Sequence, residues 1–120
     1  DFYREAKSQG INPILGCEVY VAPNSRFDRE VTGGEDRYYH LVLLAENNEG
    51  YANLMKIVSK GFVEGYYYKP RVDKELLRKY HSGIIALSAC LAGEVSRYLM
   101  KGLYDEAKKA ALEYRDIIFI

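Results

Sequence analysis

The stretch that decides the fold is residues 38–59, YYHLVLLAENNEGYANLMKIVS. Its first part, residues 38–45, is short and rich in aromatic and branched side chains, which favours a β-strand. In its second part, apolar residues recur every three or four positions, so residues 49–63 are predicted to form an amphipathic helix that packs on a sheet. Asn47 or Asn48 can cap this helix. A strand followed by such a helix is typical of an α/β fold.

The same pattern continues on both sides of this stretch. We expect strands at residues 14–22 and 84–88, and helices at residues 2–9, 74–81, 94–101 and 103–114, with a charged surface loop at residues 26–37 and a further strand opening at residue 117. Asp73 is placed to cap the helix that follows it. Alternating strands and helices indicate an α/β fold with largely parallel strands. Because the chain starts in a helix and stops at a strand, we expect part of a larger domain.

Composition limits the classes of protein to consider. The chain has 120 residues, 48% hydrophobic, and its 17 Lys and Arg balance its 17 Asp and Glu. Zero net charge removes the strongest argument for a dedicated nucleic-acid or membrane-surface binder. No apolar run approaches the roughly 20 residues that span a bilayer, and no signal peptide is visible, so an intracellular setting is expected. Cys17 and Cys90 are expected to be free thiols or ligands.

Glu18 interrupts an otherwise apolar strand, on the same face as Ile14 and Gly16. A buried carboxylate must be paired, protonated or bound to a metal. A glutamate on an edge strand that faces water or an arginine explains the same pattern. The alternation of the strand leaves both interpretations open.

His40 and Cys90 are two further candidate ligands. His40 lies in the second predicted strand, where a neutral imidazole could bind a metal, although a lone strand histidine is more often a core residue. Cys90 follows the third strand directly, in the loop SACLAG, and is either a thiolate ligand or a small buried hydrophobe. Parallel strands would bring Glu18, His40 and Cys90 together, which favours a metal site. However, His40 lies near the start of its strand, whereas a shared site would place it near the end.

Two interpretations are open for the segment Tyr66-Tyr67-Tyr68-Lys69-Pro70-Arg71. Aromatic rings interleaved with cations suit base stacking and phosphate binding, which makes Tyr68, Lys69 and Arg71 candidate nucleic-acid ligands. The alternative is a connection between helices whose tyrosines cover the core while their hydroxyls reach water. Composition by itself favours this second interpretation.

Four segments carry a resemblance to a known family. They are GINPILGCEVYVAP (residues 10–23), YYHLVLLAENNEGYANLMKIVS (38–59), GYYYKPRVDKELL (65–77) and GIIALSACLAGEV (83–95). In this order they resemble the PHP (polymerase and histidinol phosphatase) domains of bacterial DNA polymerase III alpha subunits, over nearly the whole chain.

The resemblance implies a fold and a site. The fold would be a fragment of a distorted seven-stranded (β/α) barrel, similar to a TIM barrel and with mostly parallel strands, so that residues 1–120 form a partial PHP domain. The family's metal ligands fall on Glu18, His40 and Cys90, with zinc or manganese as the expected divalent metal. In members with an intact cluster, these metals support phosphodiester hydrolysis by a proofreading 3′-to-5′ exonuclease.

The resemblance also implies a parent enzyme, a DNA-directed DNA polymerase (a nucleotidyltransferase) in DNA replication. The family's opening His-x-His motif, its next Asp and His ligands and its closing Asp-x-His motif are absent from these 120 residues, so we expect this segment alone to be inactive. DNA and other replisome subunits are the expected partners, in the cytoplasm and without membrane contact. Exposed barrel edges predict self-association of the fragment.

Two alternative functions stay open. Family members that have lost ligands use the domain as a scaffold that stabilises the polymerase or docks partners. A free-standing PHP phosphoesterase acting on a small phosphomonoester is the other alternative. The segments YYYKPR and SACLAGEV, which look like the polymerase branch, disfavour this last possibility.

Overall fold

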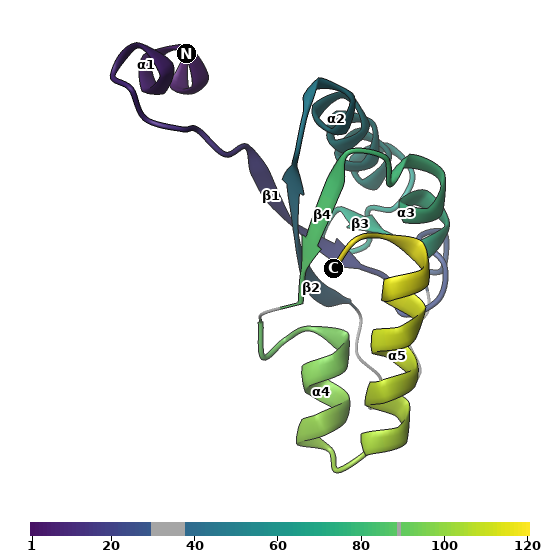
Figure 1. Ribbon diagram of the computed structural model, residues 1–120. Helices are drawn as coiled ribbons and strands as arrows, with labels where there is room; N and C mark the ends of the chain where they lie inside the picture. The colour runs from purple at the N-terminus through teal and green to yellow at the C-terminus, as the bar shows by residue number, and fades with distance from the viewer. Residues whose placement is uncertain (30–37, 89) are drawn as a thin grey trace.

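The computed structural model describes residues 1–29, 38–88 and 90–120. The Gly33-Gly34 pair of the expected surface loop lies outside the described residues. In chain order the elements are α1 (Phe2–Ser8), β1 (Gly16–Val21), β2 (Tyr39–Ala45), α2 (Asn48–Val63), β3 (Arg71–Val72), α3 (Lys74–Tyr80), β4 (Ile84–Leu87), α4 (Glu94–Met100) and α5 (Tyr104–Ile117) (Figure 1). The predicted α/β class is therefore confirmed.

The strands form one mixed sheet in the order β3-β1-β2-β4. β1 pairs with β2 and β2 pairs with β4, both antiparallel, and only the short β3 runs parallel to β1. The prediction of mostly parallel strands is therefore wrong for the described sheet. The sequence itself predicts a loop between the first two strands, and residues 22–29 and 38, the described part of that connection, contain no helix. Without a helical crossover the chain turns back, and β2 pairs antiparallel with β1.

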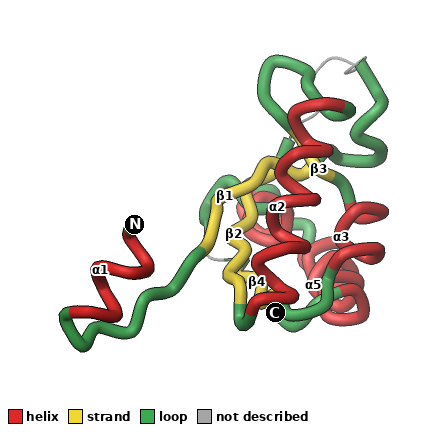
Figure 2. Tube along the Cα trace, turned by 90° about the horizontal axis from the view of Figure 1, so that it is seen from above, coloured by secondary structure: helices red, strands yellow, loops and turns green. Residues whose placement is uncertain are grey.

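The two faces of the sheet differ in burial. On one face, alternate side chains are buried against α2, α3 and the end of α5; this core includes Val19, Val21, Leu41, Leu43, Leu54, Ile57, Leu76, Leu77, Ile84, Ala86, Tyr114 and Ile117. In Figure 2 these helices lie on the same side of the strands. The opposite face, here called the open face, presents exposed or half-buried side chains, among them Glu18, Tyr20, His40, Val42 and Leu87.

The start of α2 is fixed by its cap and by a close backbone contact. The Asn47 side chain accepts a hydrogen bond from Gly50 N–H at 2.8 Å, as the sequence predicts. Gly83, with φ +75°, lies so close that a Cβ on Gly50 would come within 1.9 Å of the Gly83 carbonyl oxygen. Glycine at both positions therefore lets α2 approach the turn that leads into β4.

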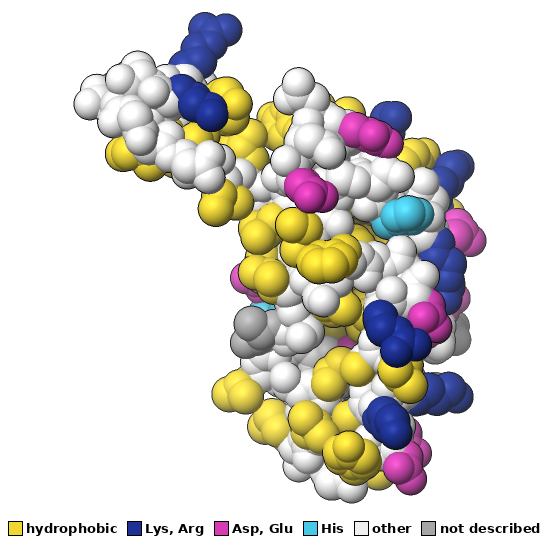
Figure 3. Space-filling model, in the orientation of Figure 1, with side chains coloured by type: hydrophobic (Ala, Val, Ile, Leu, Met, Phe, Trp, Pro, Cys, Tyr) yellow, Lys and Arg dark blue, Asp and Glu magenta, His cyan; other side chains and the backbone are white. Residues whose placement is uncertain are grey.

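Helices extend beyond both ends of the sheet. α1 has no buried residue and projects from one end, while α4 and α5 form a hairpin at the other (Figure 1). The radius of gyration is 15.2 Å, above the roughly 13.6 Å expected for a compact chain of this length. Exposed apolar side chains gather over the hairpin, including Leu91, Leu99, Met100 and Tyr104 (Figure 3).

The end of α5 differs from its prediction. The helix extends to Ile117, and strand-like pairing begins only at Phe119, which forms a parallel bridge with Ile85. Ala86 N–H donates to the Phe119 carbonyl oxygen at 2.8 Å, so the backbone after α5 does join the edge of β4. Across the described ranges, no helix has both the length and the apolar character that a membrane crossing requires.

Candidate functional site

The antiparallel pairing of β1 and β2 brings two of the three candidate ligands together. Tyr20 lies opposite His40 and Glu18 opposite Val42, so Glu18 and His40 are diagonal neighbours on the open face. Glu18 Oε1 lies 2.8 Å from His40 Nδ1. The Glu18 side chain is 50% exposed and that of His40 is 25% exposed, so the pair is partly accessible to solvent.

Cys90 reaches the same histidine from β4. Because β4 runs antiparallel to β2, its carboxyl end lies beside the start of β2, and Cys90 Sγ lies 3.5 Å from His40 Nδ1. This geometry explains why a histidine at the start of its strand can share a site with a residue that follows another strand. The structure thus brings Glu18, His40 and Cys90 together, although the parallel pairing from which we inferred their proximity is wrong.

Short backbone contacts hold Cys90 in place. His40 N–H donates to the Ala92 carbonyl oxygen at 3.0 Å, and Ala92 N–H donates to Cys90 Sγ at 3.3 Å. A Cβ on Gly93 would lie 3.0 Å from the Cys90 carbonyl oxygen and 3.3 Å from that of His40. The turn after β4 is therefore docked tightly on the start of β2, and glycine at position 93 permits this approach.

The donor set fits a divalent metal in its chemistry. Carboxylate oxygen, imidazole nitrogen and thiolate sulfur are zinc ligands, and the first two also suit manganese. His40 Nδ1 carries either one proton or one lone pair. It therefore cannot donate a full hydrogen bond to both a carboxylate and a thiolate. A cation between the three groups would satisfy all of them.

Of the two distances from His40 Nδ1, one matches the spacing of zinc ligands and the other is that of a hydrogen bond. Tetrahedral zinc would separate its nitrogen and sulfur ligands by about 3.6 Å, and its nitrogen and oxygen ligands by about 3.4 Å. The 3.5 Å between Cys90 and His40 matches this geometry, whereas the 2.8 Å between Glu18 and His40 is a hydrogen-bond length. Accordingly, no three His, Cys, Asp or Glu side chains within the described residues form a complete metal-binding group.

Two tyrosines that the sequence analysis did not select surround His40. Its ring lies 5.0 Å from the ring of Tyr20 and 6.1 Å from that of Tyr38, between centroids, and the two tyrosine rings are 4.8 Å apart. The period-two alternation of β1 places Tyr20 on the same face as Glu18. This alternation is the sequence signal that could have identified Tyr20.

The structure separates the three candidate nucleic-acid ligands. Arg71 is only 1% exposed, and its guanidinium donates to the carbonyl oxygens of Gly65, Arg26 and Asp28. Burial also lowers the pKa of this guanidinium. The donors of Arg71 are used inside the protein, which disfavours the predicted contact between Arg71 and nucleic acid. Tyr68 and Lys69 are exposed.

A buried ion pair lies next to Arg71. Arg26 Nη1 contacts Asp73 Oδ1 at 3.0 Å, and both residues are buried. Asp73 Oδ1 also accepts from Leu76 N–H at 3.0 Å, which confirms its predicted role as the cap of α3. This group ties residues 22–29 to the start of α3, and it serves the fold.

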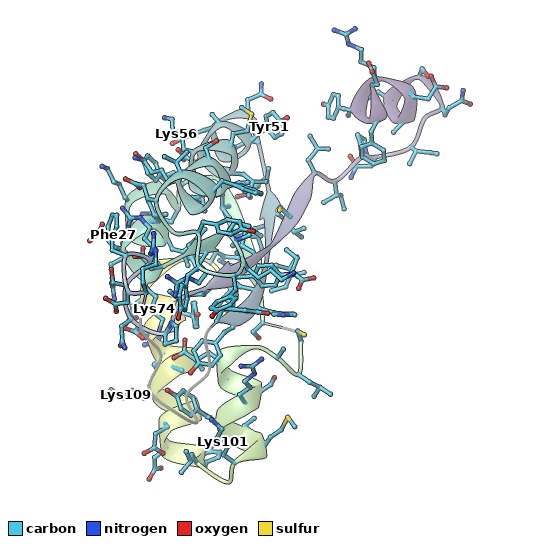
Figure 4. All side chains as sticks on the ribbon, turned by 180° about the vertical axis from the view of Figure 1, so that it is seen from behind. Phe27, Tyr51, Lys56, Lys74, Lys101 and Lys109 are labelled. Atoms are coloured by element: carbon cyan, nitrogen blue, oxygen red, sulfur yellow. The ribbon has the colours of Figure 1, made fainter. Side chains whose placement is uncertain are left out.

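A third polar cluster joins α3, α4 and α5. Lys74 Nζ lies 3.1 Å from Glu94 Oε1 and 2.5 Å from Glu113 Oε1, and the Tyr114 hydroxyl donates to Glu94 at 3.2 Å. Lys74 is labelled at this junction in Figure 4. The hydrogen bond from Lys74 lowers the pKa of Glu113, and burial raises the pKa of Tyr114. Every charge named here has an opposite partner, so the cluster holds the α4–α5 hairpin against α3.

The sheet and the Glu18, His40 and Cys90 group together define an α/β domain with a candidate metal site. The model of the PHP domain family matches residues 1–119. The chain therefore belongs to the PHP domain family, which confirms the resemblance carried by the four segments.

Relatives of the chain are bacterial polymerase subunits. It is 51% identical over 114 residues to the DNA polymerase III subunit alpha of Treponema pallidum (strain Nichols), with 95% of the chain and 10% of the relative covered. To the subunit of the same name from Thermus aquaticus it is 45% identical over 109 residues, with 90% of the chain and 9% of the relative covered. The chain thus spans about a tenth of the length of these relatives.

Proposed function

We propose that this chain is the PHP-domain segment of a DNA polymerase III alpha subunit, and that Glu18, His40 and Cys90 are ligands of a zinc or manganese ion there. Identities of 51% and 48% to such subunits along nearly the whole chain support this assignment. The observation that carries the metal site is the convergence of a carboxylate and a thiol on one imidazole nitrogen, at 2.8 and 3.5 Å.

The proposed activity of the intact domain is metal-dependent 3′-to-5′ hydrolysis of phosphodiester bonds as a proofreading exonuclease. A bound metal would supply an activated water and would neutralise the charge that develops on the phosphate. The chain's own residues would hold the ion: Glu18 and Cys90 bring negative charge, and His40 is oriented by the backbone bond from its N–H to the Ala92 carbonyl oxygen. Polymerisation, DNA and the other replisome subunits belong to the parent protein under this proposal.

The same proposal extends the sheet to a seven-stranded barrel. Its open face would then line the barrel interior, with helices on the outside, an arrangement supported by the packing of α2, α3 and α5 on the other face. Glu18, His40 and Cys90 would lie at one end of that interior.

One observation favours a different role, as a scaffold. The 2.8 Å between Glu18 Oε1 and His40 Nδ1 is a hydrogen-bond length, shorter than the separation of two ligands on one metal ion. In that case the Glu18 and His40 contact would help to hold β1 against β2, and the domain would stabilise the polymerase without bound metal.

The experiment that separates the two roles uses the full-length parent protein. Metal content and manganese- or zinc-dependent hydrolysis of single-stranded DNA are measured for the parent and for a triple variant, Glu18→Ala, His40→Ala and Cys90→Ala. Loss of metal and nuclease with polymerisation retained supports the exonuclease. If the unmodified parent has no bound metal and no nuclease activity, the scaffold role is supported.

The chain offers a matched control with the same three residue types. Glu46 and His81 are exposed, and Cys17 packs at the margin of the core. The triple variant Glu46→Ala, His81→Ala and Cys17→Ala should keep both metal and nuclease. A loss as large as in the site variant would show that the effect reflects general damage to the fold.

A further inference from the structure

Two aromatic rings and one lysine follow one another from His40, and a further exposed ring stands next to the lysine in sequence. From His40 the rings of Tyr20 and Tyr38 follow at 5.0 and 6.1 Å between centroids, and Lys69 Nζ lies 5.9 Å from the Tyr20 ring. One residue before Lys69, the Tyr68 ring is exposed. We call Tyr20, Tyr38, Tyr68 and Lys69 the aromatic track.

The segment that carries Tyr68 and Lys69 is held beside β1 by β3. Tyr20 lies opposite Arg71 in the parallel ladder, so the segment that leads into β3 passes next to Tyr20. The Arg71 guanidinium, itself buried, lies 5.1 Å from the Tyr67 ring centroid. Arg71 therefore supports the turn from beneath without contacting a ligand.

Tyr68 has the backbone conformation that marks this turn as specialised. Its φ is +64°, and no other described residue except glycine has a positive φ. An aromatic side chain in the left-handed region is strained, and such strain persists where the surroundings fix it, often at ligand sites. Here the conformation turns a ring that is 59% exposed outwards, while its edge-to-face contact with Tyr67 at 4.6 Å steadies it.

We propose that the aromatic track binds a single-stranded nucleic acid, whose bases stack on Tyr20, Tyr38 and Tyr68 while Lys69 contacts a phosphate, and whose end lies at Glu18, His40 and Cys90. Base stacking on aromatic side chains combined with a cation is the general mode of single-strand binding, and it tolerates any sequence. The lysine beside the rings repels a cationic ligand, and the rings cannot reach bases stacked inside a duplex. This proposal rests on the proposed function only in placing the end of the strand at Glu18, His40 and Cys90.

The first test is photocrosslinking with the full-length parent protein in a chelator, so that no hydrolysis occurs. The probe is a single-stranded thymidine oligonucleotide with 5-iodouracil at its 3′-terminal or penultimate position. Crosslinked peptides are mapped by mass spectrometry. We expect crosslinks to Tyr20, Tyr38 or Tyr68, and crosslinks at none of them would overturn the proposal, whatever binding occurs elsewhere on the polymerase.

Variants test whether stacking is the cause. Tyr20→Leu should raise KM for single-strand hydrolysis about tenfold with kcat less affected, whereas Tyr20→Phe keeps the stacking face and should behave as the unmodified protein. Tyr68→Gly removes the ring and suits a positive φ, so it should reduce crosslinking while the domain stays folded. An unchanged KM in Tyr20→Leu and unchanged crosslinking in Tyr68→Gly would overturn the stacking role.

Two tyrosines elsewhere provide the control. Tyr51, on α2 and labelled in Figure 4, is 43% exposed, and Tyr104 on α5 is 67% exposed. Tyr51→Leu and Tyr104→Leu should leave KM and crosslinking as they are. If the parent protein has neither metal nor nuclease activity but crosslinks to the aromatic track, the proposed exonuclease is rejected and the track is supported. If it has nuclease activity but gives no such crosslinks, the exonuclease is supported and the track is rejected.

Discussion

Glu18 and His40 occupy diagonal positions on adjacent antiparallel strands, with Glu18 Oε1 2.8 Å from His40 Nδ1. This contact depends on the direction of β2. In the observed register the first residues of β2 lie beside the last residues of β1, and β4 ends at the same place. Side chains from three strands therefore meet around one imidazole, and the chemistry of the proposed site follows from the order and direction of the strands.

Cys90→Ser should change which metal the full-length parent retains. A thiolate favours zinc, whereas an oxygen ligand shifts preference towards manganese, so the zinc-to-manganese ratio of the purified variant should fall. The ratio is measured by elemental mass spectrometry after exposure to equal amounts of both metals. Cys17→Ser is the control, because Cys17 packs against the core. Equal ratios in the unmodified protein and in Cys90→Ser would argue against the sulfur as a ligand.

Replacing Arg71 by alanine should destabilise the domain much more than replacing Lys69. Arg71→Ala leaves the carbonyl oxygens of Gly65, Arg26 and Asp28 without their donor, and should destabilise the domain by on the order of 3 kcal/mol. Lys69→Ala should change stability by less than about 0.5 kcal/mol. Hydrogen exchange of α2 and α3 within the parent protein measures both effects.

Lys69→Ala should also reduce the salt dependence of single-strand hydrolysis by the parent protein. Loss of one phosphate contact lowers the slope of log(kcat/KM) against log salt by about 0.7. An unchanged slope would remove Lys69 from the aromatic track. Lys56→Ala, on the exposed side of α2, serves as the control.

The sequence predicted those elements whose cause is local. A short run of aromatic and branched side chains located β2, helical spacing located α2, and Asp73 caps α3 as expected. Strand direction was wrong because it depends on which distant segments pair, and alternation within a strand is the same in either direction. β3 escaped notice because two residues after Pro70 are too few to show any alternation.

The candidate site was predictable for a different reason. Glu18, His40 and Cys90 each had an ordinary structural explanation. Their positions on or after three successive strands suggested a shared metal site, and the family resemblance then matched them to metal ligands. For Arg71 composition was misleading, because an arginine among tyrosines looks the same in sequence whether its guanidinium faces solvent or backbone carbonyls. The burial of Arg71 results from the fold of residues 22–29 over β3, which no local pattern encodes.

Asp73→Ala should be far more destabilising than Glu75→Ala, although both carboxylates contact Arg26. Asp73 is 2% exposed and also caps α3. Its loss removes the most buried carboxylate partner of Arg26 together with the helix cap, at a cost on the order of 3 kcal/mol, and leaves Arg26 paired only with Glu64 and Glu75. Glu75, with a side chain 75% exposed, should contribute less than about 1 kcal/mol. Hydrogen-exchange protection of α3 in the parent protein gives both values. Similar losses would mean that Arg26 does not depend on burial of its partner.

Glu113 should make the packing of α5 depend on pH. The hydrogen bond from Lys74 lowers its pKa, so its stabilising effect is complete above the ordinary glutamate pKa of about 4.3 and is lost as pH falls through the lowered value. Because the side chain is 41% exposed, the effect should stay below about 1 kcal/mol. We expect Glu113→Gln to lower the protection of α5 at pH 7 and to flatten its loss towards pH 3. Glu106→Gln, at an exposed position on the same helix, is the control, and identical pH profiles for all three proteins would show that Lys74 and Glu113 do not stabilise the hairpin.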